Sequence, residues 1–394
     1  MRVREMTSRE RTLAAIDHQE PDRVPIFFRG VAPLNHLWKD EYERVDVLLG
    51  MGVDEKITIK IEPGIHPDVR IRDWFEEGSD PRYRLACREY ETPKGVLRAV
   101  MRCTEDCSYE DGVPLASDHN ISRGIEFPVK GRDDLPKLAY LLREPDGEDI
   151  ARFREDARRK KEFAARRGIL VEGYGGPGGD LAFWLCGTNL YYLVQDDPDF
   201  GEELMEMIYN IDLKCMEIVL DEGVDIIDAR GCYETAPMWS PQLYDKLFAP
   251  RLEKKAKLAH QAGAKFSYFT EGLLMPHLDS LLRIGVDVVN GIQPGDGNDM
   301  SALKRAMGHR ICLWGGINPH EVIERGTQDD VRRAVIEVIL AAAPGGGFVL
   351  STSGGIYRTD CYDNVVTYIE TAHQFGTYPI NTSRLKAELR RSSP

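Results

Sequence analysis

The chain alternates short apolar runs with polar, glycine-rich loops and amphipathic helical segments, most regularly from residue 168 onward. The apolar runs show little alternation of apolar and polar positions, which is typical of strands covered on both faces of a parallel sheet. Each run is followed by a loop rich in Gly, Ser or charged residues. The predicted strands of this part are 169–172, 225–228, 265–269, 286–290, 311–314 and 347–350.

The first part of the chain adds two predicted strands, 23–28 and 57–61. A helix is predicted after Thr7, because Thr7 and Glu10 have the spacing of a capping box. Further helices are predicted at 40–53 and 149–167. Eight strands separated largely by helices predict an α/β fold, the (β/α)8 TIM barrel, and a doubly wound open sheet is the alternative.

Residues 62–125 interrupt this rhythm and carry no long helical pattern. The segment 90–100 has the pattern of a β-hairpin, with Pro93-Lys94-Gly95 at its turn. We therefore expect an antiparallel β insertion near the N-terminus that packs over the barrel. The expected organisation is a single (β/α)8 barrel domain, residues 1–394, that includes this insertion.

The loops after the strands of parallel β/α folds carry the chemistry, and three candidate residues lie there. Glu234 and Glu271 follow neighbouring predicted strands, where two carboxylates serve as acid and base or as metal ligands. Cys232 lies beside them, and a thiolate next to carboxylates suits Zn²⁺. We predict Glu234, Glu271 and the strand-end Tyr268 as catalytic, with Cys232, Glu234 and Glu271 as metal ligands. The alternative is that Glu234 is a capping or ion-pair residue and Cys232 a buried thiol.

Other polar and aromatic residues at the predicted strand ends are expected to bind the substrate. They are Arg29, Tyr174, Tyr233, Asn290, Gln293, Trp314 and Ser353. The glycine-rich segment 173–179 has no Lys in the position that a P-loop requires. It is instead expected to let a substrate approach backbone N–H groups closely.

Composition narrows the class of protein. The chain has 51 Lys and Arg against 65 Asp and Glu, a net charge of −14, which argues against binding to nucleic acid or anionic membranes. We expect no membrane span, because no run of about 18 apolar residues occurs. The N-terminus lacks the apolar core of a signal peptide, and the eight cysteines form no CxxC pair. These features predict a cytoplasmic protein with reduced thiols.

Several segments resemble the uroporphyrinogen decarboxylase superfamily, a group of (β/α)8 barrels that includes the decarboxylase and zinc-dependent corrinoid methyltransferases. The resemblance covers most of the chain. The segments that carry it are Thr7-Ser8-Arg9-Glu10-Arg11, Glu20-Pro21-Asp22-Arg23-Val24-Pro25, Gly173-Tyr174-Gly175-Gly176-Pro177, Met238-Trp239-Ser240-Pro241, Gly285-Val286-Asp287, Gln293-Pro294, Gly315-Gly316-Ile317 and Asp363-Asn364-Val365.

The resemblance implies a methyltransferase that moves a methyl group between a corrinoid or methylated small molecule and a thiol or folate-like acceptor. It also implies zinc, a corrinoid, a corrinoid partner protein and a homodimer. The sequence departs from the family at Gly354, where the decarboxylase has a His, and at 351–355, where the methyltransferases have a Cys. Two alternatives therefore stay open.

The first alternative is a decarboxylase acting on a carboxylated aromatic or pyrrole, in which Arg29, Arg230 and Arg358 would converge on the substrate. The second is a non-catalytic barrel that binds a small molecule or a corrinoid protein. For either enzyme the expected substrate is a small molecule.

Overall fold

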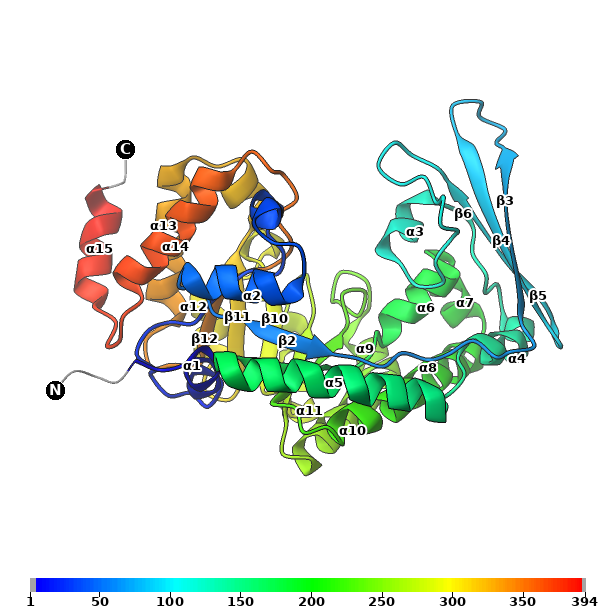
Figure 1. The fold of residues 1–394 in the computed structure, drawn as a ribbon, viewed down its shortest axis with the longest axis horizontal. Helices are drawn as coiled ribbons and strands as arrows, with labels where there is room; N and C mark the ends of the chain where they lie inside the picture. Colours follow the sequence, from blue (N-terminus) through cyan, green and yellow to red (C-terminus); the bar gives the residue numbers. More distant parts are fainter. Residues whose placement is uncertain (1–4, 392–394) are drawn as a thin grey trace.

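The structure, a computed structural model, describes residues 5–391 and contains two β-sheets (Figure 1). The larger sheet has eight parallel strands in the spatial order β1-β12-β11-β10-β9-β8-β7-β2. Every strand of the predicted barrel is present. Their bounds are β1 (Ile26–Phe27), β2 (Lys56–Ile59), β7 (Leu170–Tyr174), β8 (Ile226–Arg230), β9 (Lys265–Phe269), β10 (Val288–Ile292), β11 (Cys312–Ile317) and β12 (Phe348–Thr352).

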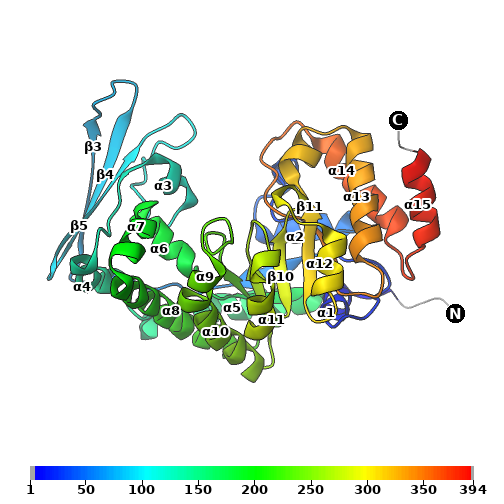
Figure 2. The same ribbon diagram turned by 180° about the vertical axis from the view of Figure 1, so that it is seen from behind.

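Helices connect the strands and cover the outer face of this sheet (Figures 1 and 2). Thr7 caps α1 through the predicted capping box with Glu10, and Asp146 caps α5 in the same way. The α-helices are α1 (Ser8–Ile16), α2 (Glu41–Gly50), α3 (Asp118–Arg123), α4 (Leu135–Leu138), α5 (Gly147–Arg167), α6 (Gly179–Cys186), α7 (Asn189–Asp196), α8 (Pro198–Leu220), α9 (Pro241–Leu247), α10 (Ala249–Gln261), α11 (Leu278–Ile284), α12 (Met300–Ala306), α13 (Gln328–Ala342), α14 (Tyr362–Phe375) and α15 (Thr382–Arg391).

The sheet curls as a TIM barrel does, but its two edge strands do not pair. Within residues 5–391, β1 and β2 share no ladder of hydrogen bonds. They are joined just before β2, where Asp54 N donates to Ile26 O at 2.7 Å. Strand β1 is only two residues long, shorter than the predicted 23–28, so little backbone is available for pairing. The architecture is therefore barrel-like with an open seam, rather than the hydrogen-bonded closed barrel expected from the sequence.

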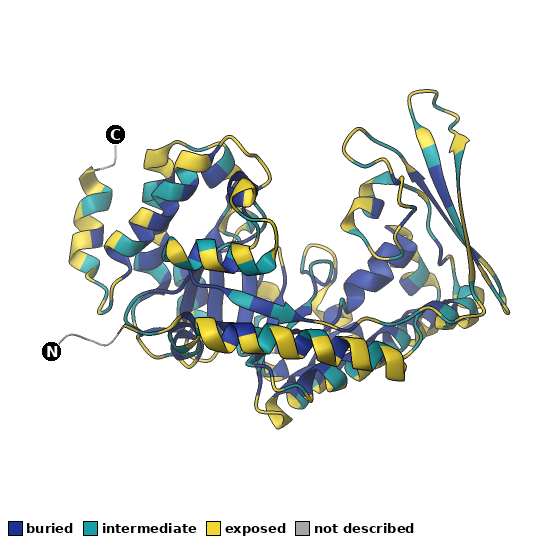
Figure 3. Ribbon diagram, in the orientation of Figure 1, coloured by how far each residue is buried: buried dark blue, intermediate teal, exposed yellow. Residues whose placement is uncertain are grey.

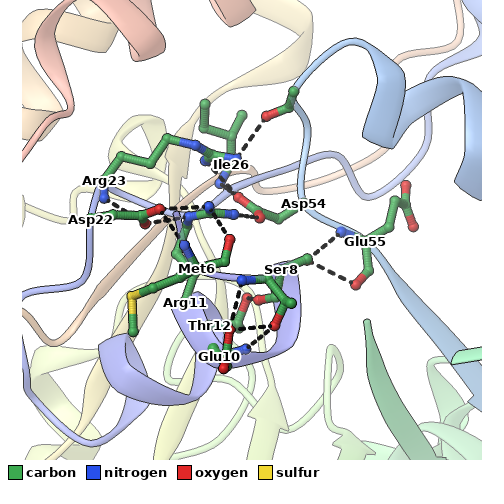
Figure 4. Close-up of polar contacts among 12 residues, drawn as sticks. Met6, Ser8, Glu10, Arg11, Thr12, Asp22, Arg23, Ile26, Asp54 and Glu55 are labelled. Carbon is green, nitrogen blue, oxygen red and sulfur yellow. Dashed lines mark hydrogen bonds and ion pairs between the residues drawn. The ribbon is translucent and has the colours of Figure 1, made fainter. Parts of the chain in front are cut away.

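A charged cluster holds this seam together at the N-terminal ends of the strands (Figure 4). Arg11 donates to Asp22 and Asp54, each at 2.6 Å. Arg23 donates to Asp54 at 2.7 Å, and Ile26 N donates to the same carboxylate at 2.9 Å. The Arg11 and Asp54 side chains are 5% and 1% exposed. The N-terminal segments that carry the family resemblance thus contribute ion pairs that link α1, β1 and the residue before β2.

The inside of the curled sheet is apolar at the N-terminal ends of its strands. There, inward-facing side chains pack against Ala15 and Ile16 of α1, which closes this end. These side chains are Phe27, Leu170, Ile226, Val288, Cys312 and Val349. Burial follows this arrangement, and β10, β11 and β12 are buried at every residue (Figure 3). With this end closed, the interior is approached from the C-terminal ends of the strands or along the seam between β1 and β2.

The predicted insertion is an antiparallel sheet of four strands in the order β3-β4-β5-β6. Its strands are β3 (Arg70–Glu77), β4 (Arg84–Thr92), β5 (Gly95–Arg102) and β6 (Gly124–Glu126), and β4 and β5 form the predicted hairpin. The sheet does not pack over the barrel as predicted. It contacts α3 and α4 and lies at one end of the molecule, away from β10–β12 (Figures 1 and 2). Among residues 5–391, no helix has the length and apolarity needed to cross a bilayer.

Candidate active site

A cavity of about 360 Å³ lies inside the curled sheet, above the apolar floor and beside the open seam. This volume is within the range of small-molecule sites. The strand residues that line it alternate with outward-facing residues, as expected for a pleated sheet. They are Phe27, Lys56, Thr58, Glu172, Asp228, Asn290, Trp314 and Ser351.

Strands β2 and β7, on one side of the cavity, carry an ion pair between a lysine and a glutamate. Lys56 of β2 forms an ion pair with Glu172 of β7, and Thr58 Oγ1 donates to the same carboxylate at 2.9 Å. The Lys56 ammonium lies 5.4 Å from the centre of the Trp314 ring. The Glu172 carboxylate is thus fully engaged, and its charge stabilises the ammonium within the sheet.

Asp228 of β8 is the second carboxyl group in the cavity. Ser267 Oγ donates to its Oδ1 at 2.6 Å. Among residues 5–391 no hydrogen-bond donor reaches its Oδ2. Burial raises the pKa of the Asp228 carboxyl, the negative charge of Glu172 adds to the shift, and Lys56 and Arg29 oppose it. A carboxyl group with a raised pKa and one unengaged oxygen is suited to donate a proton to a bound molecule.

Arg29 provides the exposed positive charge of the cavity. It follows β1, and its guanidinium carbon lies 3.1 Å from the centre of the Phe269 ring. Phe269 is the inward-facing member of the predicted Tyr268–Phe269 pair. Within residues 5–391 the Arg29 guanidinium has no ion pair, whereas Arg44 at the seam is paired with Glu55 at 2.7 Å. Arg29 is therefore able to bind an anionic group of a ligand.

Glu234 is fully buried outside the sheet and does not line this cavity. It accepts hydrogen bonds from the hydroxyls of Tyr209 and Tyr268, at 2.6 and 2.5 Å, and from Gly179 N at 2.5 Å. Burial raises the pKa of the Glu234 carboxyl to about 7, and the nearby Asp180 charge adds to the shift. Tyr268 points outward to Glu234, so this predicted catalytic pair ties the sheet to the surrounding loops.

Glu234 and Glu271, the two predicted catalytic carboxylates, do not face one open cavity. The space that they share, beside His277, has a volume of about 10 Å³, which is room for at most one water molecule. Glu271 itself reaches solvent at the open end of the sheet. Partial desolvation raises the pKa of the Glu271 carboxyl, and the guanidiniums of Arg29 and Arg230 oppose the shift.

The predicted metal ligands do not form a metal centre. Among residues 5–391, no three His, Cys, Asp or Glu side chains are grouped so that they could hold a metal ion. Two of the three predicted ligands are unsuited in themselves. Glu234 is engaged by three donors, and burial raises the pKa of the Cys232 thiol well above its usual value, which disfavours the thiolate.

Other predicted residues stabilise loops around the cavity. The Tyr233 hydroxyl donates to Asp118 at 3.0 Å, and Arg230 bridges Asp118 and the buried Asp180 at 2.7 and 2.5 Å. Burial raises the pKa of Asp180 to about 6, against the effect of Arg230. These contacts join α3 of the insertion to the loop after β8, and Arg230 is therefore not available for a ligand.

Two further predicted residues form a second link between loops. Ser353 Oγ donates to Gln293 Oε1 at 2.8 Å, and Gln293 donates to Asp296 at 2.9 Å. Tyr174 is partly buried at the end of β7 and is not among the lining residues. Of the predicted binding residues, the structure brings Arg29, Asn290 and Trp314 together at the cavity.

Sequence reasoning missed the charged residues Lys56, Glu172 and Asp228. The signal was present, because each is a charged residue within or beside an apolar strand. Charged side chains are seldom buried unless they are paired, so their occurrence in such strands indicates a functional or ion-paired interior. The prediction had placed the chemistry at the carboxyl ends of the strands and in the loops that follow them.

A family model described as uroporphyrinogen decarboxylase (URO-D) matches residues 180–375, which include strands β8 to β12. No curated protein matches the chain. The resemblance noted in the sequence is therefore supported by an independent family match.

Solved structures show the likeness in fold. A methyltransferase from Methanosarcina mazei has a TM-score of 0.57 and 15% identity, covering 94% of this chain and 99% of that chain. A B12-independent methionine synthase from Shewanella sp. W3-18-1 has a TM-score of 0.37 and 12% identity, covering 60% and 67%. A 3-keto-D-glucoside 4-epimerase from E. coli has a TM-score of 0.37 and 14% identity, covering 59% and 87%. Identities this low speak to the fold alone, and only the first score among these three exceeds one half.

Proposed function

We propose that this chain is an enzyme whose active site is the polar cavity inside the eight-stranded sheet, and the match of residues 180–375 to a family model described as uroporphyrinogen decarboxylase supports this. The proposed reaction is methyl transfer from a methylated small molecule that carries a carboxylate. The proposed acceptor is a corrinoid on a partner protein, a thiol or a folate-like compound. One observation carries the proposal: an unpaired Arg29 and an Asp228 with a raised pKa line the same cavity.

Arg29 has the role of substrate binding. Its guanidinium forms charge-assisted hydrogen bonds with the substrate carboxylate, while Phe269 supports the guanidinium plane from below. The Lys56–Glu172 pair is neutral overall and contributes polarity without competing for the same anion. Trp314 and Phe27, whose rings are 4.6 Å apart, provide an apolar wall for the body of the substrate.

Asp228 has the role of general acid. When the bond between the methyl carbon and its heteroatom breaks, the heteroatom keeps the electron pair and takes the proton from Asp228. The methyl group passes to the acceptor. Ser267 orients the carboxyl group through its 2.6 Å hydrogen bond and leaves Oδ2 toward the cavity. The donor and acceptor must therefore meet at the open ends of the strands.

Zinc, which the family resemblance implies, does not fit the residues at the predicted site. Cys232, Glu234 and Glu271 are not among any group of side chains within residues 5–391 that could hold a metal ion. Glu234 in particular has its oxygens occupied by Tyr209, Tyr268 and Gly179. No step of the proposed reaction is assigned to a metal.

Decarboxylation is the second candidate, because it needs the same two groups. A cation would bind the substrate, and an acid would protonate the carbanion left after loss of CO₂. Of the three arginines considered for this reaction, Arg29 alone lines the cavity. Arg230 is tied to Asp180 and Asp118, and Arg358 pairs with Asp360 at the surface. One available arginine favours a substrate with one or two carboxylates over a polycarboxylated pyrrole.

Methoxybenzoates labelled with ¹³C test both reactions at once, since they carry a methyl ether and a carboxylate. The protein would be incubated with a set of them and cob(I)alamin, a thiol or tetrahydrofolate, and the products measured by mass spectrometry. A hydroxybenzoate and a methylated acceptor are the expected products. Release of labelled CO₂ would instead support the decarboxylase. Binding without turnover of any member would contradict the enzymatic proposal and support a binding barrel.

A further inference from the structure

The outer edge of the four-stranded sheet is formed by β3, whose one strand partner within residues 5–391 is β4. Of its eight residues none is buried and six are exposed. The sheet lies at one end of the molecule, away from the eight-stranded sheet (Figures 1 and 2). Alternate N–H and C=O groups along such an edge are available to another strand.

Charge changes sign along this strand. Arg70 and Arg72 lie in its first half, and Glu76 and Glu77 in its second half. Charges on an edge strand normally discourage pairing with a second copy, because like charges meet. Two antiparallel copies of β3 run in opposite directions, so the basic half of one copy lies beside the acidic half of the other.

The pleat of the two strands limits the registers in which these opposite charges can pair. Directly opposed residues of an antiparallel pair lie on the same face, so a twofold axis must pass through one residue of the strand. With the axis at Trp74, Arg72 of each copy faces Glu76 of the other and the two indoles meet at the centre. With the axis at Asp73, two aspartates face each other, which is destabilising.

The contacts within one chain leave Arg72 available for this pairing. Among residues 5–391, Arg72 has no ion pair, and its guanidinium lies 5.1 Å from the centre of the Trp74 ring. Glu76 accepts from Trp74 Nε1 at 2.7 Å. The cation nearest to Glu76 is Arg98, at 3.4 Å, which is a weak hydrogen-bond distance. Asp73, by contrast, is engaged by Arg88 at 2.6 Å.

We propose that two copies of this chain associate through antiparallel pairing of β3 about Trp74, with reciprocal Arg72–Glu76 ion pairs. The two four-stranded sheets then form one continuous sheet across the dimer, a form of strand addition in which each chain provides the edge for the other. The interface is independent of the cavity and of the reaction proposed for it.

Charge reversal tests this pairing directly. Sedimentation equilibrium would be measured for the full chain, for Arg72→Glu, for Glu76→Arg and for the double variant. Each single variant places like charges opposite each other at two symmetric positions. We expect the dimer dissociation constant to rise about tenfold or more in each, and to return to within about threefold of wild type in the double variant.

Two controls separate a lost interface from a general effect of charge or a loss of folding. Arg325→Glu reverses an exposed charge that pairs with Glu321 outside this sheet, and it should leave the dimer unchanged. Circular dichroism and thermal unfolding would show that each variant folds. A monomeric wild-type chain would overturn the proposal. So would single variants that dimerise normally, or a folded double variant that stays monomeric.

Discussion

Glu234 and Asp228 are carboxyl groups on neighbouring segments, yet their surroundings assign them different roles. Glu234 is enclosed by two tyrosine hydroxyls and a backbone N–H, and no oxygen is left for a ligand. Asp228 has one engaged oxygen and one that is open to the cavity. Both have a raised pKa because both are desolvated. A raised pKa alone therefore does not identify a catalytic acid, and the direction that the side chain faces is decisive.

Glu234 makes the stability of the protein depend on pH. Its pKa of about 7 in the folded state exceeds the ordinary value of 4.5, so the folded protein binds this proton more tightly. The resulting stabilisation is complete below the ordinary pKa and is lost as pH rises through about 7. Relative to Glu234→Gln, wild type should lose about 2.5 kcal/mol of unfolding free energy between about pH 5 and about pH 8.

Urea unfolding of both proteins across this pH range would measure the difference. Gln keeps the size of the protonated Glu side chain, so the variant should fold and show a flatter profile. Parallel profiles for the two proteins would show that Glu234 is already ionised at low pH in the folded state, against the account of its burial.

The seam between β1 and β2 shows how a barrel-like sheet is held where strand pairing is missing. The two-residue strand β1 pairs with β12 and not with β2, and the Arg11–Asp54–Arg23 cluster holds the two edges together instead. The open seam is also one wall of the cavity. The missing pairing between β1 and β2 thus lies beside the space that could hold a ligand.

Removal of one charge from this buried cluster should be costly. Asp54→Asn leaves Arg11 and Arg23 facing an uncharged partner in a desolvated site, and we expect a loss of about 3–5 kcal/mol of unfolding free energy. Glu321→Gln is a matched control, because it breaks an exposed pair with Arg325 and should cost about 1 kcal/mol or less. Equal effects in chemical unfolding of the two variants would show that the cluster does not hold the seam.

The positions of the strands were predictable from the sequence, because apolar runs and glycine-rich loops are local features of sequence. The predicted bounds of 265–269 agree with β9, and the other large-sheet strands after residue 168 shift by only one to three residues. The open seam was not predictable, since it depends on contacts between Arg11 and Asp54, which lie 43 residues apart. The position of the insertion likewise depends on Asp118 meeting Arg230.

At the scale of the whole molecule, an apolar layer and α1 close one end of the sheet, and a polar layer lines the other end. The sequence identified three residues that line this cavity, Arg29, Asn290 and Trp314. It did not identify Lys56 or Asp228, because the inward direction of a strand residue depends on register. Register is set by pairing between strands that are distant in sequence.

The central claim is that the chemistry lies inside the curled sheet and not at Glu234. The most direct test is kcat of Asp228→Asn and Glu234→Gln, measured at about pH 6.5 on the substrate found in the methoxybenzoate assay, with circular dichroism as the folding control. We predict that Asp228→Asn lowers kcat by about 10²–10⁴-fold, while Glu234→Gln stays within about threefold of wild type. Full activity in Asp228→Asn together with a large loss in Glu234→Gln would contradict the account.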